Sequence, residues 1–367
     1  MVETTGYLLN YILLLLNQIS EIQIMSDYTY NPIGQINGSG DERALFLKQF
    51  AGEVLSVMPE TQNTLGMTYK KVLKGAKSYQ FPYLGKLTPK YHIPGVQLSG
   101  QPTGQNEKVI SLDSLLVVDR FVAKVDDLMK HYDERSEYAS QMAQSLATLK
   151  DNHVIFEGIL GARESEQVTG TGASGLVIVN DKLKLDTGVP ANAQTSVELA
   201  QALKAALKES AQNFKEKDVA GSLRKVCFIG WDMYFTALDA VDTNGFSFFN
   251  KDFHTGSAES GMMPNIYGIE LQGTNNIIST DLSAVANDQV AGTGVHFYHK
   301  GDFSKSIGLI MCEKAVAEVM AQDITVELGH YDVSRKGQLL TADLFTGTGW
   351  LRPECLVELS LDTVTVN

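Results

Sequence analysis

Cysteine is scarce in this chain: 367 residues contain three, far apart in sequence. An odd and widely spaced set of Cys227, Cys312 and Cys355 predicts neither a disulfide framework nor a zinc site. We expect each thiol to behave as a small buried apolar group in a protein that assembles under reducing conditions.

Basic residues are outnumbered as well, because 30 Lys and Arg stand against 43 Asp and Glu, for a formal net charge of −13. A protein whose main task is to grip nucleic acid needs clustered Lys and Arg, so this balance argues against that class. An acidic chain is compatible with a container that lets DNA slide along its lining. Ordinary acidic solubility is the simpler explanation of the charge alone.

Motifs for catalysis and cofactor binding are missing too. The sequence has no H-E-x-x-H, Walker A, EF-hand or G-x-S-x-G pattern. GTGASG (170–175) matches G-x-G-x-x-G, but the strand-like LVIV (176–179) follows it where a dinucleotide site needs a helix, so a loop is predicted. His296 and His299 lie in a strand-like region where H-x-x-H spacing does not suit a metal. We expect no catalytic residue, cofactor or metal; an enzyme with an unfamiliar carboxylate site is the alternative.

No apolar run is long enough to cross a bilayer, which takes about 20 residues. The longest, YLLNYILLLL (7–16), has no Lys or Arg near it, since the first basic residue is Arg43, so a secretory signal is not indicated. Met25-Ser26-Asp27 looks like a translation start. We therefore expect residues 1–24 to be an upstream extension, with an amphipathic arm segment as the alternative, and no membrane partner.

The length predicts about two to three compact units, and 44% hydrophobic residues can bury a sizeable core. Residues 26–40 are rich in turn formers and predict a flexible arm. A short helix is expected to begin at Asp41.

Residues 68–110 predict a long hairpin with two Pro-containing turns and a tip rich in Gly, Gln and Ser. Its aromatic side chains are interleaved with lysines, and it has few aliphatic ones. Such a hairpin cannot bury both faces against its own subunit. We therefore expect contacts with a neighbouring subunit through Tyr69, Lys70, Lys71, Lys74, Lys77, Tyr79, Phe81 and Tyr83. For the lysines, contact with DNA and a solvated strand face are the alternatives.

A long helix is predicted from about Val125 to Leu160. One face carries a continuous stripe, in steps of three and four, of Met142, Leu146, Leu149, His153, Phe156 and Leu160. The other faces carry charged residues such as Lys150. Loops around a short strand at 176–179 are expected to follow.

A second unit is expected from Thr195, which has capping-box spacing to Glu198 at the start of an amphipathic helix. A buried strand (225–230) then leads into a helix (231–240), followed by strands and turns to residue 300. Strands combined with helices in this way predict an α+β layer.

The C-terminal part is expected to contain a strand and a helix within 306–319, and two further strands around 324–328 and 357–361. GWLRPE (349–354) predicts a turn into the last strand. Trp350 and Arg352 are of residue types common at interface anchors. A turn that docks Trp350 into its own domain is equally consistent with the sequence.

Six segments occur in the same order as in a known family: 41–55, 75–85, 107–147, 225–240, 306–319 and 349–354. They resemble the major capsid protein of short-tailed, double-stranded-DNA phages (podoviruses), which has the Hong Kong 97-like fold. The resemblance implies an N-terminal arm (1–66) and an extended loop (67–108) that lies across the adjacent subunit. It also implies a peripheral domain (109–194) with a spine helix and an axial domain (195–302), both completed by 303–367.

The same resemblance implies the partners. Copies would form pentamers and hexamers of an icosahedral shell around a scaffolding protein in the host bacterial cytoplasm. The shell would later fill with double-stranded DNA through a portal protein, with weak and non-specific DNA contacts, and the protein would end in the virion. An encapsulin-type compartment of the same fold is the alternative. Some relatives crosslink through a Lys and an Asn; no such pair can be assigned here, so a non-covalent shell is expected.

Overall fold

The computed structural model describes residues 63–64, 66–98, 100–125, 135–168, 171–183, 196–239, 265–277, 279–283 and 300–362. The expected start at Met25, the arm, the helix from Asp41 and the histidine pair at 296–299 lie outside these residues. By its internal contacts the chain divides into two compact units.

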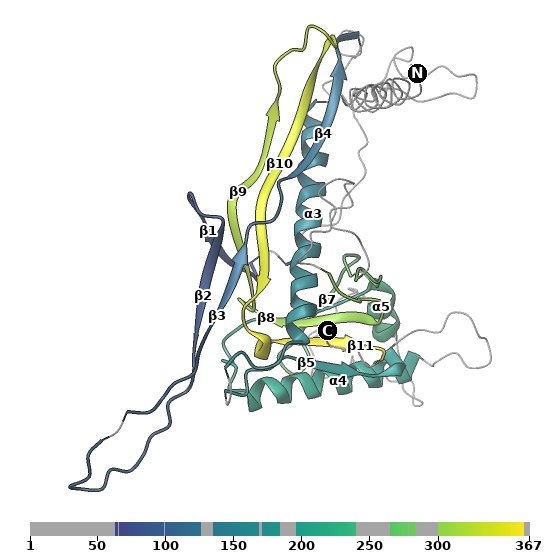
Figure 1. The fold of residues 1–367 in the computed structure, drawn as a ribbon. Coiled ribbons are helices and arrows are strands. Elements are labelled where there is room, and N and C mark those ends of the chain that lie inside the picture. Colours follow the sequence, from purple (N-terminus) through teal and green to yellow (C-terminus); the bar gives the residue numbers. More distant parts are fainter. Residues whose placement is uncertain are drawn as a thin grey trace, which may run out of the picture. The chain divides into compact units, whose positions relative to one another are not determined.

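The larger unit comprises residues 57–117, 141–325 and 343–367 and is built on a five-stranded mixed sheet of order β5-β11-β8-β6-β7 (Figure 1). In it, β8 is antiparallel to both neighbours, whereas the two outer strands pair in parallel. The strands are β5 (Leu176–Val179), β11 (Leu356–Ser360), β8 (Ser306–Cys312), β6 (Lys225–Ile229) and β7 (Glu270–Gly273).

Helices cover this sheet, because every residue of β11 and nearly every residue of β6 and β8 is buried. The predicted helix after Thr195 is confirmed as α4 (Ser196–Glu216), which buries Leu199, Leu203 and Leu207 at a spacing of four. The predicted strand and helix at 225–240 are confirmed as β6 and α5 (Trp231–Asp239). All three cysteines are buried and free, as expected.

The long helix is α3 (Arg135–Ala162), whose 28 residues give a length of about 42 Å. It confirms the predicted helix from Arg135 onward, and residues 126–134 lie outside the described residues. Two glycines let its C-terminal half approach the core closely. A Cβ on Gly158 would lie 2.4 Å from Leu309 Cδ2, and one on Gly161 would lie 2.6 Å from Trp350 Cβ. None of the helices in the described part of the chain has the length and hydropathy of a membrane span.

The hairpin consists of β2 (Ser78–Leu84) and β3 (Gln105–Ser111), paired antiparallel along their whole length. The expectation that it begins at residue 68 is wrong. The preceding strand, β1 (Tyr69–Val72), instead pairs in parallel with β9 (Val316–Leu328). A turn with Gly75 at φ 72° separates β1 from β2. The sequence does not reveal this break, because aromatic residues and lysines alternate on both sides of it.

The predicted helix within 306–319 is also wrong. After β8, a turn with Lys314 at φ 64° leads directly into β9. Residues 316–320 are all buried. A strand buried on both faces shows no alternation of apolar and polar residues, so its sequence cannot be told from that of a buried helix.

The smaller unit contains residues 118–140 and 326–342 among others. β10 (Gly337–Trp350) follows β9, and both belong to a four-stranded sheet of order β1-β9-β10-β4, with β4 at Leu116–Ala123. Of this sheet, the smaller unit contains only residues 118–123, 326–328 and 337–342. The Lys124 N–H donates to the Lys336 carbonyl at 2.8 Å. A Cβ on Gly337 would lie 2.3 Å from Phe121 Cζ, so only glycine allows this close approach.

Candidate functional site

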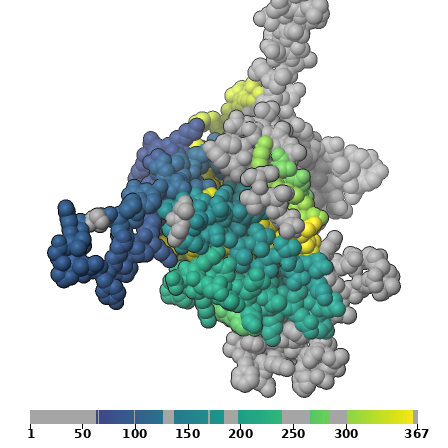
Figure 2. Space-filling model, turned by 60° about the horizontal axis from the view of Figure 1, so that its bottom comes forward, coloured from purple at the N-terminus to yellow at the C-terminus, as the bar shows by residue number. Residues whose placement is uncertain are grey.

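The loop between β2 and β3, residues 85–104, projects from the surface of the larger unit (Figure 2). Among its described residues, almost every side chain is exposed. Large hydrophobic residues are included, and Tyr91 is fully exposed. The exposed hydrophobic residues of the loop and its first flank are Leu84, Leu87, Tyr91, Ile93, Val96 and Leu98. So many exposed large hydrophobic side chains on one loop indicate a site of interaction.

The chain around this loop is basic in a protein that is otherwise acidic. Residues 61–106 contain no Asp or Glu and six lysines, whereas the rest of the chain has 24 basic and 43 acidic residues. The loop itself contributes Lys86, Lys90 and His92. The loop is therefore both apolar and positively charged, and an acidic partner surface would attract it.

Four of the predicted contact residues lie together on β1 and β2. The Tyr69 and Tyr79 rings pack edge-on against Phe81, with centroids 6.1 and 4.8 Å from it. The Lys71 ammonium group lies 5.1 Å from the centre of the Tyr79 ring. By contrast, the remaining predicted lysines, Lys70, Lys74 and Lys77, are exposed to solvent.

Three other predicted residues meet at the base of the hairpin, where Tyr83 lies close to the end of β10. The Tyr83 hydroxyl donates a hydrogen bond to the Leu351 carbonyl, and burial raises the pKa of this tyrosine. Trp350 is buried in the core of its own unit. This agrees with the alternative in which the turn docks Trp350 into its own domain. Arg352 is exposed, and burial raises the pKa of the nearby Glu354 carboxyl.

Further contacts fix the base of the hairpin. The Lys108 ammonium group of β3 lies 3.4 Å from the centre of the Trp350 ring, and burial lowers the pKa of this lysine. The Gly85 N–H donates to the Gly104 carbonyl at 2.9 Å. A Cβ on Gly104 would lie 2.7 Å from Val168 Cγ1. The hairpin is thus anchored up to Gly85 and Gly104, and the loop extends beyond this anchor.

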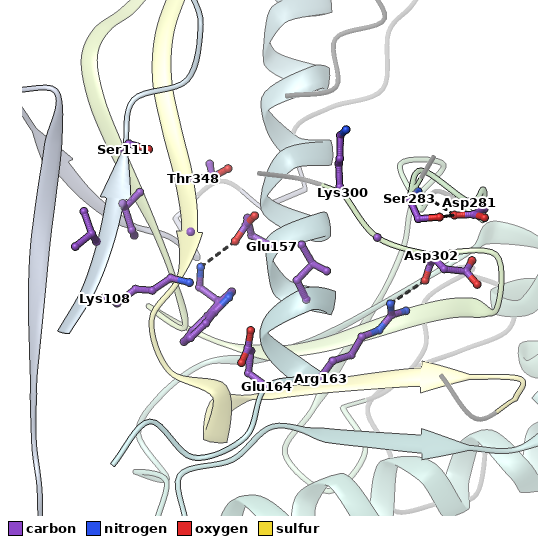
Figure 3. Close-up of a pocket in the computed structure, with 16 residues that line it drawn as sticks. Lys108, Ser111, Glu157, Arg163, Glu164, Asp281, Ser283, Lys300, Asp302 and Thr348 are labelled. Atoms are coloured by element: carbon purple, nitrogen blue, oxygen red, sulfur yellow. Dashed lines mark hydrogen bonds between the residues drawn. The ribbon is translucent and has the colours of Figure 1, made fainter. Parts of the chain in front are cut away.

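A groove of about 530 Å³ crosses the C-terminal half of α3 (Figure 3). We call it the α3 groove. Side chains of α3 form its floor, β3 and the end of β10 lie on one side, and segments 281–283 and 300–302 lie on the other. Its lining residues are Lys108, Val109, Ile110, Ser111, Glu157, Leu160, Arg163, Glu164, Asp281, Ser283, Lys300, Gly301, Asp302, Thr348, Gly349 and Trp350.

Four carboxylates line the α3 groove: Glu157, Glu164, Asp281 and Asp302. Glu157 accepts a hydrogen bond from the Trp350 backbone N–H at 3.3 Å. Hydrogen bonds from the side chain and from the backbone N–H of Ser304 lower the pKa of the Asp302 carboxyl. In the described part of the chain, no group of three or more His, Cys, Asp and Glu side chains is placed to hold a metal ion.

One cation of the α3 groove is already neutralised within the subunit. Arg163 donates through Nε and Nη2 to the two carboxylate oxygens of the buried Glu358, each at 2.7 Å. The same guanidinium donates to the Asp302 carbonyl at 2.8 Å. This pair fastens the end of α3 to β11 and leaves the groove with an excess of negative charge.

Two adjacent charged residues in the middle of α3 are buried, although Lys150 lies outside the apolar stripe that the sequence predicts. Lys150 forms an ion pair with Glu318 of β9. Asp151, which is fully buried, accepts hydrogen bonds from the Thr64 N–H at 2.9 Å and from Asn276 Nδ2 at 2.8 Å. Asp151 therefore ties the segment that enters the larger unit to α3.

The α3 groove and the buried charges of α3 are not predictable from the sequence pattern. A partial signal was present, since Glu157 and Leu160 are three residues apart and so share one face of α3, and Glu164 follows shortly after the helix ends. The other lining residues come from distant segments. No motif connects them.

The fold described here, a helix-covered mixed sheet with a long helix and a projecting hairpin, is that of phage capsid subunits of the Hong Kong 97-like type. The chain is similar to the capsid protein of cyanophage P-SCSP1u, with a TM-score of 0.71 and 29% identity over 91% of this chain and 99% of that chain. The mature capsid of bacteriophage PhiM1 matches with a TM-score of 0.66 and 15% identity over 93% of this chain and 100% of that chain. The second match supports the fold alone.

The sequence matches the family described as "Gp10A-like: Major capsid protein" over residues 80–360, and the chain belongs to this family. It is 29% identical over 329 residues to the major capsid protein of Escherichia phage T7, covering 86% of this chain and 91% of that protein. It is 27% identical over 344 residues to the major capsid protein of Enterobacteria phage T3, covering 90% and 96%.

The function is therefore that of a major capsid protein of an icosahedral phage capsid, and the protein is a structural component of the virion. The predicted fold, family and function are confirmed. The similarity to proteins of phages T7 and T3 supports the podovirus type. The matches point to phage capsids and give no support to the encapsulin-type alternative. The matched structures are those of capsids, which is consistent with oligomeric assembly of this chain.

Proposed function

We propose that copies of this chain join into pentamers and hexamers of the shell through the hairpin β2–β3, whose loop lies on an adjacent copy. One observation carries the proposal: loop 85–104 exposes large hydrophobic side chains that no described residue of its own subunit covers. Burial of apolar surface contributes roughly 25 cal/mol per Å². An exposed apolar loop gains this free energy only by contact with a partner.

Within this proposal the predicted contact residues divide into two groups. Tyr69, Lys70, Lys71, Lys74, Lys77, Tyr79, Phe81 and Arg352 are the inter-subunit contact candidates. Tyr83 and Trp350 support the interface indirectly, because they hold the base of the hairpin. Many weak contacts per copy suffice, since each contact formed raises the effective concentration for the next.

The remaining partners are also proposed. Assembly takes place around a scaffolding protein in the cytoplasm of the host bacterium, and a portal protein admits double-stranded DNA. The acidic charge of the chain, −13 overall, supports contacts with DNA that are weak and non-specific. We propose a non-covalent shell and no catalytic activity.

The first experiment is electron microscopy of the protein alone and co-expressed with the scaffolding protein of its own genome. Closed icosahedral particles that require the scaffold are expected. Particles of the same yield without it would contradict the role of the scaffold. Soluble monomers under both conditions would contradict assembly through this chain altogether.

A shortened loop tests the hairpin directly. Gln101 Nε2 donates to the Thr88 carbonyl at 2.7 Å, so replacing residues 89–100 by a two-residue Gly-Ser turn leaves this closing contact in place. The variant is expected to fold and to form no closed shells. The control replaces residues 89–100 by Gly and Ser at unchanged length, and it should fail equally, because apolar contact rather than reach is lost. Normal shells from the shortened variant would contradict the role of the loop.

A further inference from the structure

We propose that Cys312 and Cys355 form a disulfide bond within one subunit when the shell meets an oxidant, and that both remain thiols while the protein folds and assembles. The oxidant is hydrogen peroxide, which is small enough to reach a buried sulfur. The bond itself requires no contact of loop 85–104 with a neighbour. Only its timing rests on the proposed function, through assembly in the host cytoplasm.

The pairing of β8 with β11 brings the two cysteines together. These strands are antiparallel, with Leu356 opposite Met311. Continued by one residue, this register places Cys355 opposite Cys312, where the 3₁₀ helix η5 (Pro353–Cys355) leads into β11. Residues opposite each other in an antiparallel pair have Cα atoms about 4.5–5.5 Å apart. A disulfide needs about 4.4–6.8 Å, so this register satisfies the requirement without movement of the backbone.

The side chains of the pair also interact. A hydrogen bond with the Cys355 thiol, together with burial, raises the pKa of the Cys312 thiol. The third cysteine of the chain differs in this respect. Cys227 of β6 lies opposite Ile310, two positions from Cys312 along β8, and burial raises its pKa without a thiol partner. The structure thus assigns one pair and leaves Cys227 as an internal control.

Cys355 is the thiol that reacts first. It keeps 2% of its surface exposed, whereas Cys312 is completely buried. Lys217, just after α4, is partly exposed and close enough to interact electrostatically with Cys355. A neighbouring ammonium group favours the thiolate, which is the nucleophilic form of cysteine. Cys312, whose pKa is raised, is therefore the second thiol, which completes the bond.

The reaction consumes one molecule of hydrogen peroxide for each bond. The Cys355 sulfur attacks one peroxide oxygen, the O–O bond breaks, and a sulfenic acid and a first water molecule form. The Cys312 sulfur then attacks the sulfenic sulfur, the S–O bond breaks, and the S–S bond forms with release of a second water molecule. The two thiols lose two electrons and two protons in total, and the peroxide accepts them.

The bond would fasten together the two ends of the segment that contains β9 and β10. These ends lie side by side, because the N–H groups of Leu351 and Arg352 donate to the Ala315 carbonyl at 2.8 and 3.1 Å. A disulfide that closes a long loop raises stability by restricting the unfolded chain. The host cytoplasm keeps thiols reduced, whereas a released virion meets oxidants. The bond would therefore strengthen the shell only after release.

Differential labelling of the three thiols tests the inference. Shells assembled with the scaffolding protein, and unassembled subunits in parallel, are treated with hydrogen peroxide and denatured. Free thiols are blocked with N-ethylmaleimide, disulfides are reduced, and the released thiols receive deuterated N-ethylmaleimide before digestion and mass spectrometry. Cys312 and Cys355 are expected to carry the heavy label in equal amounts, and Cys227 the light one. Unreduced digests should contain a peptide pair joined through Cys312 and Cys355.

Each other result contradicts a particular part of the inference. Heavy label at Cys227 to the same extent would overturn the pairing, as would no heavy label at a peroxide dose that fully oxidises glutathione. Joined peptides of mixed isotope from shells of ¹⁴N and ¹⁵N subunits would place the bond between copies. Heavy label in producing cells quenched in acid would show that the bond forms before release and overturn the timing. Failure of shells to form would contradict the proposed function alone, since unassembled subunits still report on the pair.

Thermal stability gives a second measurement. Peroxide should raise the Tm of parent shells by about 3–6 °C. Cys355→Ala should abolish this rise, whereas the matched control Cys227→Ala, at another buried thiol, should retain it. Each variant is compared with its own untreated sample, so a loss of stability from the substitution itself cancels. An equal rise in both variants, or none in the parent, would overturn the role of the pair.

Discussion

Lys150 of α3 and Glu318 of β9 form an ion pair in the interior of the larger unit, where both side chains are almost inaccessible to solvent. The Thr68 hydroxyl donates to the same glutamate at 3.4 Å. The pair connects the long helix to the first half of β9. The pair stabilises the fold and is not part of loop 85–104.

Removing one member of this pair should be strongly destabilising. Lys150→Met leaves the Glu318 carboxylate buried without its counter-ion and should lower the free energy of unfolding by about 3–5 kcal/mol. Urea denaturation of the unassembled subunit measures this. The double variant Lys150→Met, Glu318→Met removes both charges and should recover most of the loss. A loss below about 1 kcal/mol in the single variant would show that the carboxylate finds another partner.

Asp151 should stabilise the segment around Thr64, which it connects to α3. In Asp151→Ala the N–H of Thr64 and the side chain of Asn276 lose a buried, charged acceptor, at a cost of at least about 2 kcal/mol. Hydrogen exchange of the Thr64 amide should become faster than in the parent. Gln144→Ala, at an exposed position of α3, serves as the control and should leave that amide unchanged. Equal protection in both variants would contradict the role of Asp151.

Gly161 should not tolerate a methyl group. A Cβ there would lie 2.5 Å from Leu356 Cδ1 and 2.6 Å from Trp350 Cβ. Gly161→Ala should therefore destabilise the subunit by about 1–3 kcal/mol through overpacking. This outweighs the gain of roughly 1 kcal/mol in helix propensity. Thermal unfolding of the subunit gives the sign; a stabilised variant would mean that α3 shifts at no cost.

The Glu354 carboxyl predicts a pH-dependent effect. Burial raises its pKa above the unfolded value, so the group stabilises the fold below its unfolded pKa of about 4.3, and this contribution is lost as the pH rises through the folded pKa. Glu354→Gln should therefore raise the free energy of unfolding at about pH 7. The difference from the parent should vanish in acid. The exposed Glu327→Gln is the control, and a difference that grows in acid would contradict the prediction.

Elements with strong local signals could be predicted from the sequence. The apolar spacing of α4 and the step from β6 into α5 were both correct, because each depends on neighbouring residues only. Residues 313–319 could not be predicted, since burial on both faces removes the alternation that identifies a strand. The start of the hairpin failed for a different reason: Tyr69 pairs with Ala317, and no local pattern reports so distant a partner.

The candidate site, too, could be predicted only where neighbouring residues carry the signal. Alternating aromatic side chains indicated the hairpin and its need of a neighbour, and the packing of Tyr79 against Phe81 agrees with this pattern. The α3 groove brings Lys108, Glu164 and Asp302 together from three distant segments, so its existence depends on tertiary structure. The sequence could offer only one helix face of it.

The position of β1 has a consequence for solubility before assembly. It is an edge strand of its sheet, so one row of its backbone groups is open to pairing with another chain. Lys70 and Lys71 place two charges on this strand of four residues. Charged side chains and short length both hinder edge-to-edge joining of sheets. A protein that is concentrated with copies of itself during assembly is thus protected against edge-to-edge stacking of its sheets, which would produce an open fibre and not a closed shell.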